Sequence, residues 1–326
     1  MAKDRIFSAV QPTGDLHVGN YLGAIKNWVK LQNSGKYDCF FCVVDYHSLT
    51  GDMDAKKRHS QVFKTVAELL ALGIDPEKST FFIQSEVPEH TELAWIFNTV
   101  TPMSELLRMT QFKDKSGDQK KNINVGLFDY PVLQSADILL YKATHVPVGQ
   151  DQVQHVELTR DIARWFNNRY EDFFPEAKAK LTEFPKVMSL LNPEKKMSKS
   201  YGDAHVINLS DSPEIIEKKI KKAVTDSGKG KAPGAENLMM LLKSFADKGT
   251  FKQFVEAGKK GEVRYGDLKK AVSDSISLYF NDFREKREGF LVDEVKTRKI
   301  MSTGAEKARL VAIETMDRVR KIVGVR

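Results

Sequence analysis

Short apolar runs alternate with amphipathic patterns in the first part of the chain. Runs at 5–10, 39–44 and 80–84 are rich in apolar and β-branched residues, which is typical of buried strands. The stretch 21–29 between the first two runs places apolar residues on one face of a helix, and the stretch 62–70 does the same before Gly73 and Pro76 end it. This order predicts an α/β fold with a parallel sheet and crossover helices.

The rest of the chain is predicted to be mainly helical. Helical patterns lie at 93–100 and 104–111, and a further helix follows Val146–Gly149. From about Ser210 the pattern is helical throughout, so we expect an α/β domain at 1–205 and a helical domain at 206–326. The polar stretch 113–121 predicts an exposed loop, which fits a solvated linker and a lysine-bearing flap over an anionic substrate equally well.

Composition places the chain among soluble globular proteins. Of its 326 residues, 41% are hydrophobic and 29% are charged, which excludes a mostly disordered protein. No apolar stretch approaches the roughly 18 residues of a membrane span, and no signal-like apolar region precedes the first strand, so we expect a cytoplasmic protein with no membrane partner. The net charge of +7 favours an anionic partner such as a nucleic acid or a nucleotide, although a lysine-rich surface explains it as well.

The cysteines, Cys39 and Cys42, have the spacing of a metal or redox motif. They lie in a continuous apolar run that predicts a strand, where residues three apart point to opposite faces. No second cysteine pair completes a ligand set. We therefore expect buried thiols, with no zinc or iron–sulfur cluster.

Two polar segments carry candidate phosphate chemistry. The first joins the first strand to a helix and contains His17, Gly19 and Asn20; a helix N-terminus favours an anion, although an ordinary strand-to-helix turn would look the same. The second, Lys196-Met197-Ser198-Lys199-Ser200, has lysines that could hold a polyphosphate, although lysine runs are usually solvated.

Together these segments resemble the class I aminoacyl-tRNA synthetases. That family carries a His-Ile-Gly-His signature and a Lys-Met-Ser-Lys-Ser loop around a Rossmann-like, doubly wound parallel sheet. The first motif here ends in Asn20 where the signature has its second histidine, a departure of the kind tolerated in the tryptophan and tyrosine subgroup. The resemblance implies that Asn20 supplies an amide donor at the ATP site.

A third segment, 130–141, places the lone carboxylate of Asp137 in an otherwise apolar helix. Burial of a carboxylate is costly unless it is paired, so a local cap or ion pair is one interpretation. The segment also resembles the part of bacterial and mitochondrial tryptophanyl-tRNA synthetases whose aspartate binds the indole N–H. Some members have Met where this chain has Gln134, which would change the packing beside the indole.

Two further segments agree with this subgroup. The stretch 149–152 is similar to its Gly-Glu-Asp-Gln segment, with Gln150 in place of Glu. The stretch Asp45-Tyr46-His47 resembles its Asp-x-His and follows a predicted strand, where open parallel sheets bind ligands.

The resemblance implies a tryptophan–tRNA ligase that joins tryptophan to ATP as an adenylate and then to tRNA(Trp). Catalysis would be positioning and electrostatics by Lys196, Lys199 and Gln11. Mg²⁺ would be held mainly by ATP oxygens, and the protein would be a homodimer. The implied ATP-binding residues are Gln11, Pro12, Thr13, His17, Gly19, Asn20, Gly149, Gln150, Asp151, Val187, Lys196, Met197, Ser198, Lys199 and Ser200. The implied tryptophan-binding residues are Asp137, Phe7, His47, Tyr130 and Gln152.

Other functions stay open at this point. A tyrosyl-tRNA synthetase would share the fold and both loops, a non-catalytic RNA-binding relative would share the fold, and a generic nucleotidyltransferase would share the first motif. No metal site is expected from the spacing of the other histidines, which we expect at surface or structural positions. These are His59, His90, His145, His155 and His205.

Overall fold

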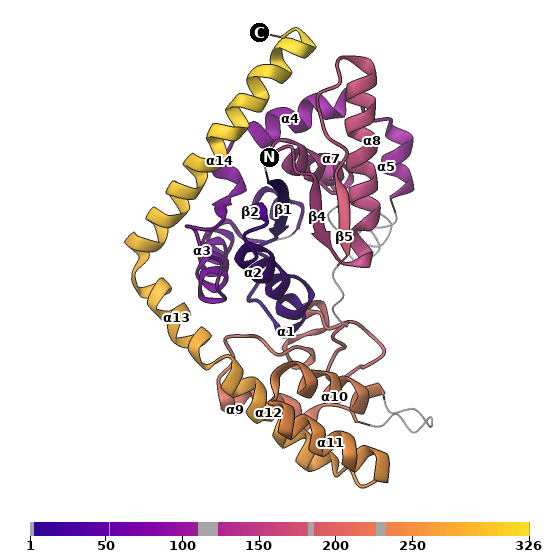
Figure 1. Ribbon diagram of the computed structural model, residues 1–326, viewed down its shortest axis with the longest axis vertical. Helices are drawn as coiled ribbons and strands as arrows, with labels where there is room; N and C mark the ends of the chain where they lie inside the picture. Colours follow the sequence, from indigo (N-terminus) through magenta and orange to yellow (C-terminus); the bar gives the residue numbers. More distant parts are fainter. Residues whose placement is uncertain (1–2, 52, 110–122, 182–185, 226–232, 326) are drawn as a thin grey trace. The chain divides into compact units, whose positions relative to one another are not determined.

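The computed structural model describes residues 3–51, 53–109, 123–181, 186–225 and 233–325, without the side chain of Asp151. It contains a parallel sheet (Figure 1), and the described residues give this sheet five strands in the order β3-β2-β1-β4-β5. The strands are β1 (Asp4–Val10), β2 (Tyr37–Val43), β3 (Thr80–Ile83), β4 (His145–Val148) and β5 (Lys178–Leu181). The predicted α/β class and parallel sheet are therefore confirmed. The expected loop at 113–121 lies outside the described residues.

Helices connect the strands and continue beyond the sheet. Those before residue 170 are α1 (Val18–Asn20), α2 (Lys26–Asn33), α3 (Ala55–Ala71), α4 (Glu89–Asn98), α5 (Met103–Arg108), α7 (Val125–Leu139) and α8 (Val153–Arg169). Those after residue 210 are α9 (Pro213–Lys222), α10 (Pro233–Phe245), α11 (Lys248–Lys260), α12 (Tyr265–Tyr279), α13 (Asn281–Val292) and α14 (Glu294–Val323). The predicted helical character of the tail is thus confirmed. Between α1 and α2 the helix takes a π-helical form at Tyr21–Ile25.

Strand β5 has no counterpart among the strands predicted from the sequence. It is the edge strand next to β4, with α8 beside it (Figure 1), and two of its four residues are lysines. Most of its residues are exposed, so it lacks the apolar run that marks a buried strand.

The apolar runs of β1 and β2 form part of a dense core. Cys39 and Cys42 are both fully buried in β2, which confirms the prediction of core thiols. Burial raises the pKa of the Cys39 thiol to about 11 and that of Cys42 well above its usual value. Phe40 of the same strand stacks on Tyr141, whose ring centroid is 4.8 Å away.

The chain folds into two compact units whose limits differ from the expected division at residue 205. The first unit comprises Met1–Gly14, Asn27–Thr182 and Phe290–Arg326, and the second comprises Asp15–Lys26 and Glu183–Gly289. Helix α14 therefore belongs to the unit that contains the sheet, whereas the segment 196–200 belongs to the unit that contains α9–α12. Helical periodicity alone does not reveal which surface a helix packs against, so the functional division at 205 stays a prediction.

Helix α14 packs along β3 and also contacts α4, past which it runs in Figure 1. A stripe of small residues allows this close approach, because Ala305, Ala308 and Ala312 are all buried on its inner face. The guanidinium of Arg320 makes a two-pronged ion pair with Glu92 of α4 at 2.9 and 2.6 Å. Among the described residues, no helix is both long and apolar enough to cross a membrane.

Candidate active site

Asp137 lies on α7 with its side chain only 1% exposed. Its Oδ2 accepts a hydrogen bond from His47 Nε2 at 2.7 Å, and its Oδ1 accepts from His90 Nδ1 at 2.6 Å. Gln84 Nε2 also donates to Oδ1, at 2.7 Å. These partners lie 47 to 90 residues away in sequence, so the interpretation of Asp137 as a local cap or ion pair is wrong.

These donors keep the carboxylate of Asp137 ionised. Burial by itself would raise its pKa, but the charges and hydrogen bonds of His47 and His90 outweigh burial and hold the pKa well below its usual value. A buried carboxylate held by several donors in this way is a fixed acceptor. It can accept a hydrogen bond from a ligand donor without first being desolvated.

A cavity of about 320 Å³ lies beside this network in the unit that contains the sheet. Its wall includes His47 and Tyr130, two of the residues expected to bind tryptophan. Leu49 and Leu133 give it apolar surface. Mostly apolar walls with a few fixed polar groups suit a ligand with an aromatic part.

The other expected tryptophan-binding residues do not line this cavity. Phe7 is 2% exposed and stacks on Tyr141, with ring centroids 5.7 Å apart. It therefore packs against a residue that bonds His90 of the network. Gln152 is half-buried at the start of α8. The roles expected for these two side chains stay predictions.

The sheet places two predicted ATP-binding segments at neighbouring strand ends. Gln11 directly follows β1 and Gly149 directly follows β4, and these two strands pair with each other. The chain turns from one side of the sheet to the other here, since β1 also pairs with β2. In open α/β sheets this switch point is where ligands bind. Gln11 is half-buried, Pro12 is buried and Thr13 is exposed.

In the second unit, His17 caps the helical segment that begins with α1. Its Nδ1 accepts a hydrogen bond from the backbone N–H of Gly19 at 3.0 Å, and Asn20 Oδ1 accepts from the His17 backbone N–H at 3.0 Å. Asn20 therefore closes a capping box, leaving its amide nitrogen as the donor end. A Cβ at position 19 would lie 2.8 Å from His17 Cε1, so only glycine lets the imidazole fold over this turn.

The charges around His17 link it to the lysine loop. Burial, followed by the charges of Lys199 and Lys196, lowers the pKa of His17 from 6.5 to about 4. The ring is therefore neutral at pH 7, and because Nδ1 accepts, Nε2 carries the proton. The lysines of the 196–200 loop are thus close enough to His17 to affect its charge state.

The loop itself is held by backbone bonds and by a buried ion pair. Met197 is buried, and its N–H donates to the Val187 carbonyl at 2.9 Å. Just beyond the loop, Lys219 Nζ lies 2.8 Å from carboxylate oxygens of both Asp203 and Asp211. Lys196 is exposed and Lys199 is half-buried, so their side chains can reach an anion outside the protein surface.

Comparison with known proteins agrees with this arrangement. The model of the family of class I tRNA synthetases for tryptophan and tyrosine (W and Y) matches residues 2–281. The chain belongs to this family.

Individual solved structures are similar over the whole length. The tryptophanyl-tRNA synthetase of Campylobacter jejuni, solved with ADP and tryptophan, is 37% identical, with a TM-score of 0.87 over 98% of this chain and 100% of that chain. The tryptophanyl-tRNA synthetase of Mycoplasma pneumoniae is 31% identical, with a TM-score of 0.87 over 99% of this chain and 98% of that chain. The tyrosyl-tRNA synthetase of Archaeoglobus fulgidus is 20% identical, with a TM-score of 0.69 over 88% of this chain and 90% of that chain, and shares the fold.

Sequence reasoning missed several residues of this class I synthetase that surround Asp137. Gln84 and His90 are fully buried and donate to its carboxylate, and Tyr141 bonds His90 through its hydroxyl at 2.7 Å. The sequence offered one usable signal, namely that a buried carboxylate needs donors. It could not say which of the distant polar residues supply them, because the network joins α4 and α7 with the ends of β2 and β3.

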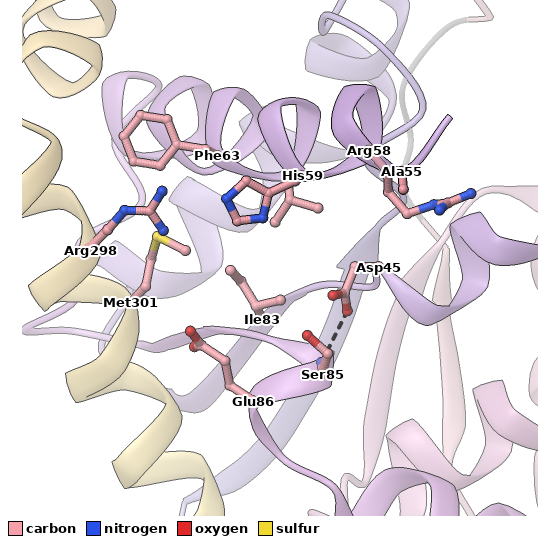
Figure 2. Close-up of a pocket in the computed structure, with 11 residues that line it drawn as sticks. Asp45, Ala55, Arg58, His59, Phe63, Ile83, Ser85, Glu86, Arg298 and Met301 are labelled. Carbon is pink, nitrogen blue, oxygen red and sulfur yellow. Dashed lines mark hydrogen bonds between the residues drawn. The ribbon is translucent and has the colours of Figure 1, made fainter. Parts of the chain in front are cut away.

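A second cavity of about 290 Å³ lies in the same unit of this synthetase, between α3, α14 and the end of β3 (Figure 2). Figure 2 shows Asp45, whose carboxylate accepts the Ser85 N–H at 3.0 Å, and the side chain of Arg298 from α14. None of the described side chains expected to bind ATP or tryptophan lines this cavity. It is therefore separate from the candidate active site.

Proposed function

We propose that the chain is a tryptophan–tRNA ligase of the cytoplasm. It activates tryptophan with ATP to give tryptophanyl-adenylate and pyrophosphate, and then transfers tryptophan to tRNA(Trp). The observation that carries this proposal is the full-length match to tryptophanyl-tRNA synthetases at 31–37% identity. One of those structures holds ADP and tryptophan, which supports the corresponding substrates here.

Asp137 is the residue proposed to choose the amino acid. The indole N–H is a donor only, and the buried carboxylate of Asp137 is an acceptor next to the cavity lined by His47 and Tyr130. A ligand of similar shape without this donor would leave a buried acceptor unpaired. Phe7 and Gln152 are proposed to complete the pocket.

In the first step the tryptophan carboxylate attacks the α-phosphate of ATP in line, and the bond to pyrophosphate breaks. No protein nucleophile is needed, so positioning and charge account for the rate. Lys196 and Lys199 would neutralise the pyrophosphate as negative charge moves onto it, and Gln11 would orient the reacting phosphate. The neutral His17 would donate from Nε2 to a phosphate oxygen.

The remaining ATP contacts are proposed from the same two motifs and from the strand ends. Backbone and side chains at 11–13, 19–20, 149–151, 187 and 197–200 would hold the nucleotide. Mg²⁺ would be carried by ATP oxygens, because the described residues contain no group of three or more histidine, cysteine or acidic side chains suited to a metal.

Helices after residue 206 are proposed to bind the tRNA anticodon region. The net charge of +7 supports an anionic partner of this kind. A homodimer is proposed as well, since large apolar side chains on α4, α5 and α7 are exposed in the single chain. Trp95 is 72% exposed, Met103 is 67% exposed and Val125 is 80% exposed. Sedimentation equilibrium of the purified chain measures this directly.

The test of the enzymatic proposal is exchange of labelled pyrophosphate into ATP with tryptophan, tyrosine or phenylalanine. We expect exchange with tryptophan only. Asp137→Ala should lower kcat/KM for tryptophan by about tenfold or more, since a hydrogen bond to a charged acceptor is lost. Asp161→Ala, which removes an exposed carboxylate of α8, should leave the exchange unchanged.

Other outcomes identify the alternatives. Exchange with tyrosine alone would move the assignment to the tyrosyl enzyme. A folded protein that binds tRNA but exchanges with no amino acid would leave the non-catalytic RNA-binding function.

A further inference from the structure

The two oxygens of Asp137 have different surroundings. Oδ1 accepts from both Gln84 and His90, whereas among the described residues His47 is the donor that reaches Oδ2. A carboxylate oxygen accepts about two hydrogen bonds, so Oδ1 is filled and Oδ2 retains one acceptor position. His47 also lines the cavity, whereas Gln84 and His90 do not. Oδ2 is therefore the oxygen that is bonded to a residue of the cavity wall.

The donors on Oδ1 are themselves fixed in orientation. The Gln84 Oε1 accepts the backbone N–H of Tyr46 at 3.1 Å, so its amide NH₂ must face Asp137. His90 lies between the carboxylate and the Tyr141 hydroxyl, at 2.6 and 2.7 Å. Since an ionised carboxylate only accepts, His90 Nδ1 carries a proton and donates to Oδ1, while Nε2 forms the hydrogen bond with the Tyr141 hydroxyl.

Tyr141 is held firmly enough to fix the orientation of the His90 ring. It is fully buried, and its ring stacks on Phe7 and Phe40. Its own backbone carbonyl accepts Arg5 Nη1 at 2.6 Å. Tyr141, His90 and Asp137 therefore form a continuous chain of hydrogen bonds that ends on the buried carboxylate.

We propose that His90, oriented by Tyr141, is a positioning residue for amino-acid choice: it fills Oδ1 of Asp137 so that the ring N–H of the substrate is accepted by Oδ2. This inference rests on the proposed tryptophan-activating function. Without His90, the carboxylate loses a donor, is free to turn or to take up a proton, and no longer penalises a ligand that lacks the ring N–H. His90 would thus control discrimination without touching the substrate.

The experiment compares tryptophan with 3-(benzothiophen-3-yl)alanine, in which sulfur replaces the ring N–H in a ring system of nearly the same shape. The measured quantity is the ratio of kcat/KM for the two amino acids in pyrophosphate exchange. In His90→Phe this ratio should fall by about tenfold or more, because the hydrogen bond to the ligand loses its fixed acceptor. The KM for ATP should not change.

His90→Asn is the rescue variant, since an asparagine amide nitrogen can occupy the place of Nδ1 and donate to Oδ1. His90→Asn should keep the ratio of the two kcat/KM values within about threefold of wild type. That change is smaller than the one expected when a hydrogen bond to a charged group is lost. His59→Phe, at an exposed position of α3, is the matched control and should leave the ratio unchanged. Tyr141→Phe keeps the stacked ring but removes the hydrogen bond that orients His90, and it should lower the ratio as well.

Two results would overturn the inference. One is a folded His90→Phe that keeps the wild-type ratio. The other is an equal loss of activity on both amino acids, which is what a merely structural role would give. If His90→Phe does not fold, an unchanged ratio in Tyr141→Phe overturns it instead. Failure of the proposed function is distinguishable, because wild type would then show no tryptophan-dependent exchange.

Discussion

Gly304 of α14 lies so close to Phe81 of β3 that a Cβ at position 304 would be 1.7 Å from the Phe81 carbonyl oxygen. This oxygen belongs to the backbone of a buried strand, so it cannot move aside as the end of a flexible side chain could. The contact fixes the distance at which the last helix covers the edge of the sheet, since α14 is in contact with β3 along this stretch.

Gly304→Ala should destabilise the unit that contains the sheet. The added methyl group forces α14 away from β3, at a cost of about 1–3 kcal/mol or more. The measurement is the midpoint of urea unfolding followed by tryptophan fluorescence. Gly289→Ala in α13 is the control: a Cβ there meets nothing within 4 Å, so helix propensity should make it neutral or stabilising. Equal unfolding midpoints for wild type and Gly304→Ala would contradict this prediction, because α14 could then move away from β3 without loss of stability.

Lys219→Met should weaken the attachment of the lysine loop. Lys219 is only 7% exposed and neutralises Asp203 and Asp211, so its removal leaves negative charge without its partner, at a cost of about 3–5 kcal/mol. Because Asp203 follows the loop closely, the KM for ATP should rise while the KM for tryptophan stays near its wild-type value.

The matched control for that variant is Lys270→Met, since Lys270 forms an exposed pair with Asp274 in which the side chains are 76% and 63% exposed. Its removal should change stability by less than about 1 kcal/mol. If both variants lose the same stability, Lys219 is an ordinary surface lysine.

His17 should make the protein less stable as the pH falls from about 6.5 towards 4. The unfolded state binds a proton near pH 6.5, whereas burial and the nearby lysines lower the pKa of folded His17 to about 4. The unfolded state therefore binds more protons across this range, and the free energy of unfolding decreases with decreasing pH. Above pH 6.5 both states are neutral at His17 and the effect vanishes.

The direct measurement is an NMR titration of the His17 ring, assigned with His17→Asn. In Lys199→Met, one of the charges that lower the pKa is removed, so the titration should move upward towards 6.5. A wild-type midpoint at or above 6.5 would contradict the electrostatic link between His17 and the lysine loop.

Local pattern was sufficient for much of the fold. Apolar runs identified β1, β2 and β3, because these strands are largely buried. Apolar residues at helical spacing around Val66 and Ile276 identified two helices, because one face of each helix is buried. The polar edge strand β5 leaves no such pattern, and it was missed. The polar motifs at His17 and Lys196 were recognised because the two together resemble the signatures of one family, whereas each alone also fits an ordinary turn or a solvated loop.

Contacts between residues that are distant in the sequence could not be predicted from local pattern. The need of Asp137 for donors follows from its residue type and its apolar surroundings, but the choice of His47, Gln84 and His90 depends on where separate elements end in space. The same holds for α14, whose helical stripe is visible in the sequence although its packing against Phe81 is not.

The sequence by itself determined strands β1, β2 and β3, the helical tail, the buried thiols and the family to which the chain belongs, because each of these follows from local periodicity or from a contiguous motif. Only the tertiary structure decided which donors meet each oxygen of Asp137 and which unit contains α14. Those features arise from contacts between residues tens to hundreds of positions apart, and no local pattern encodes the geometry of such contacts.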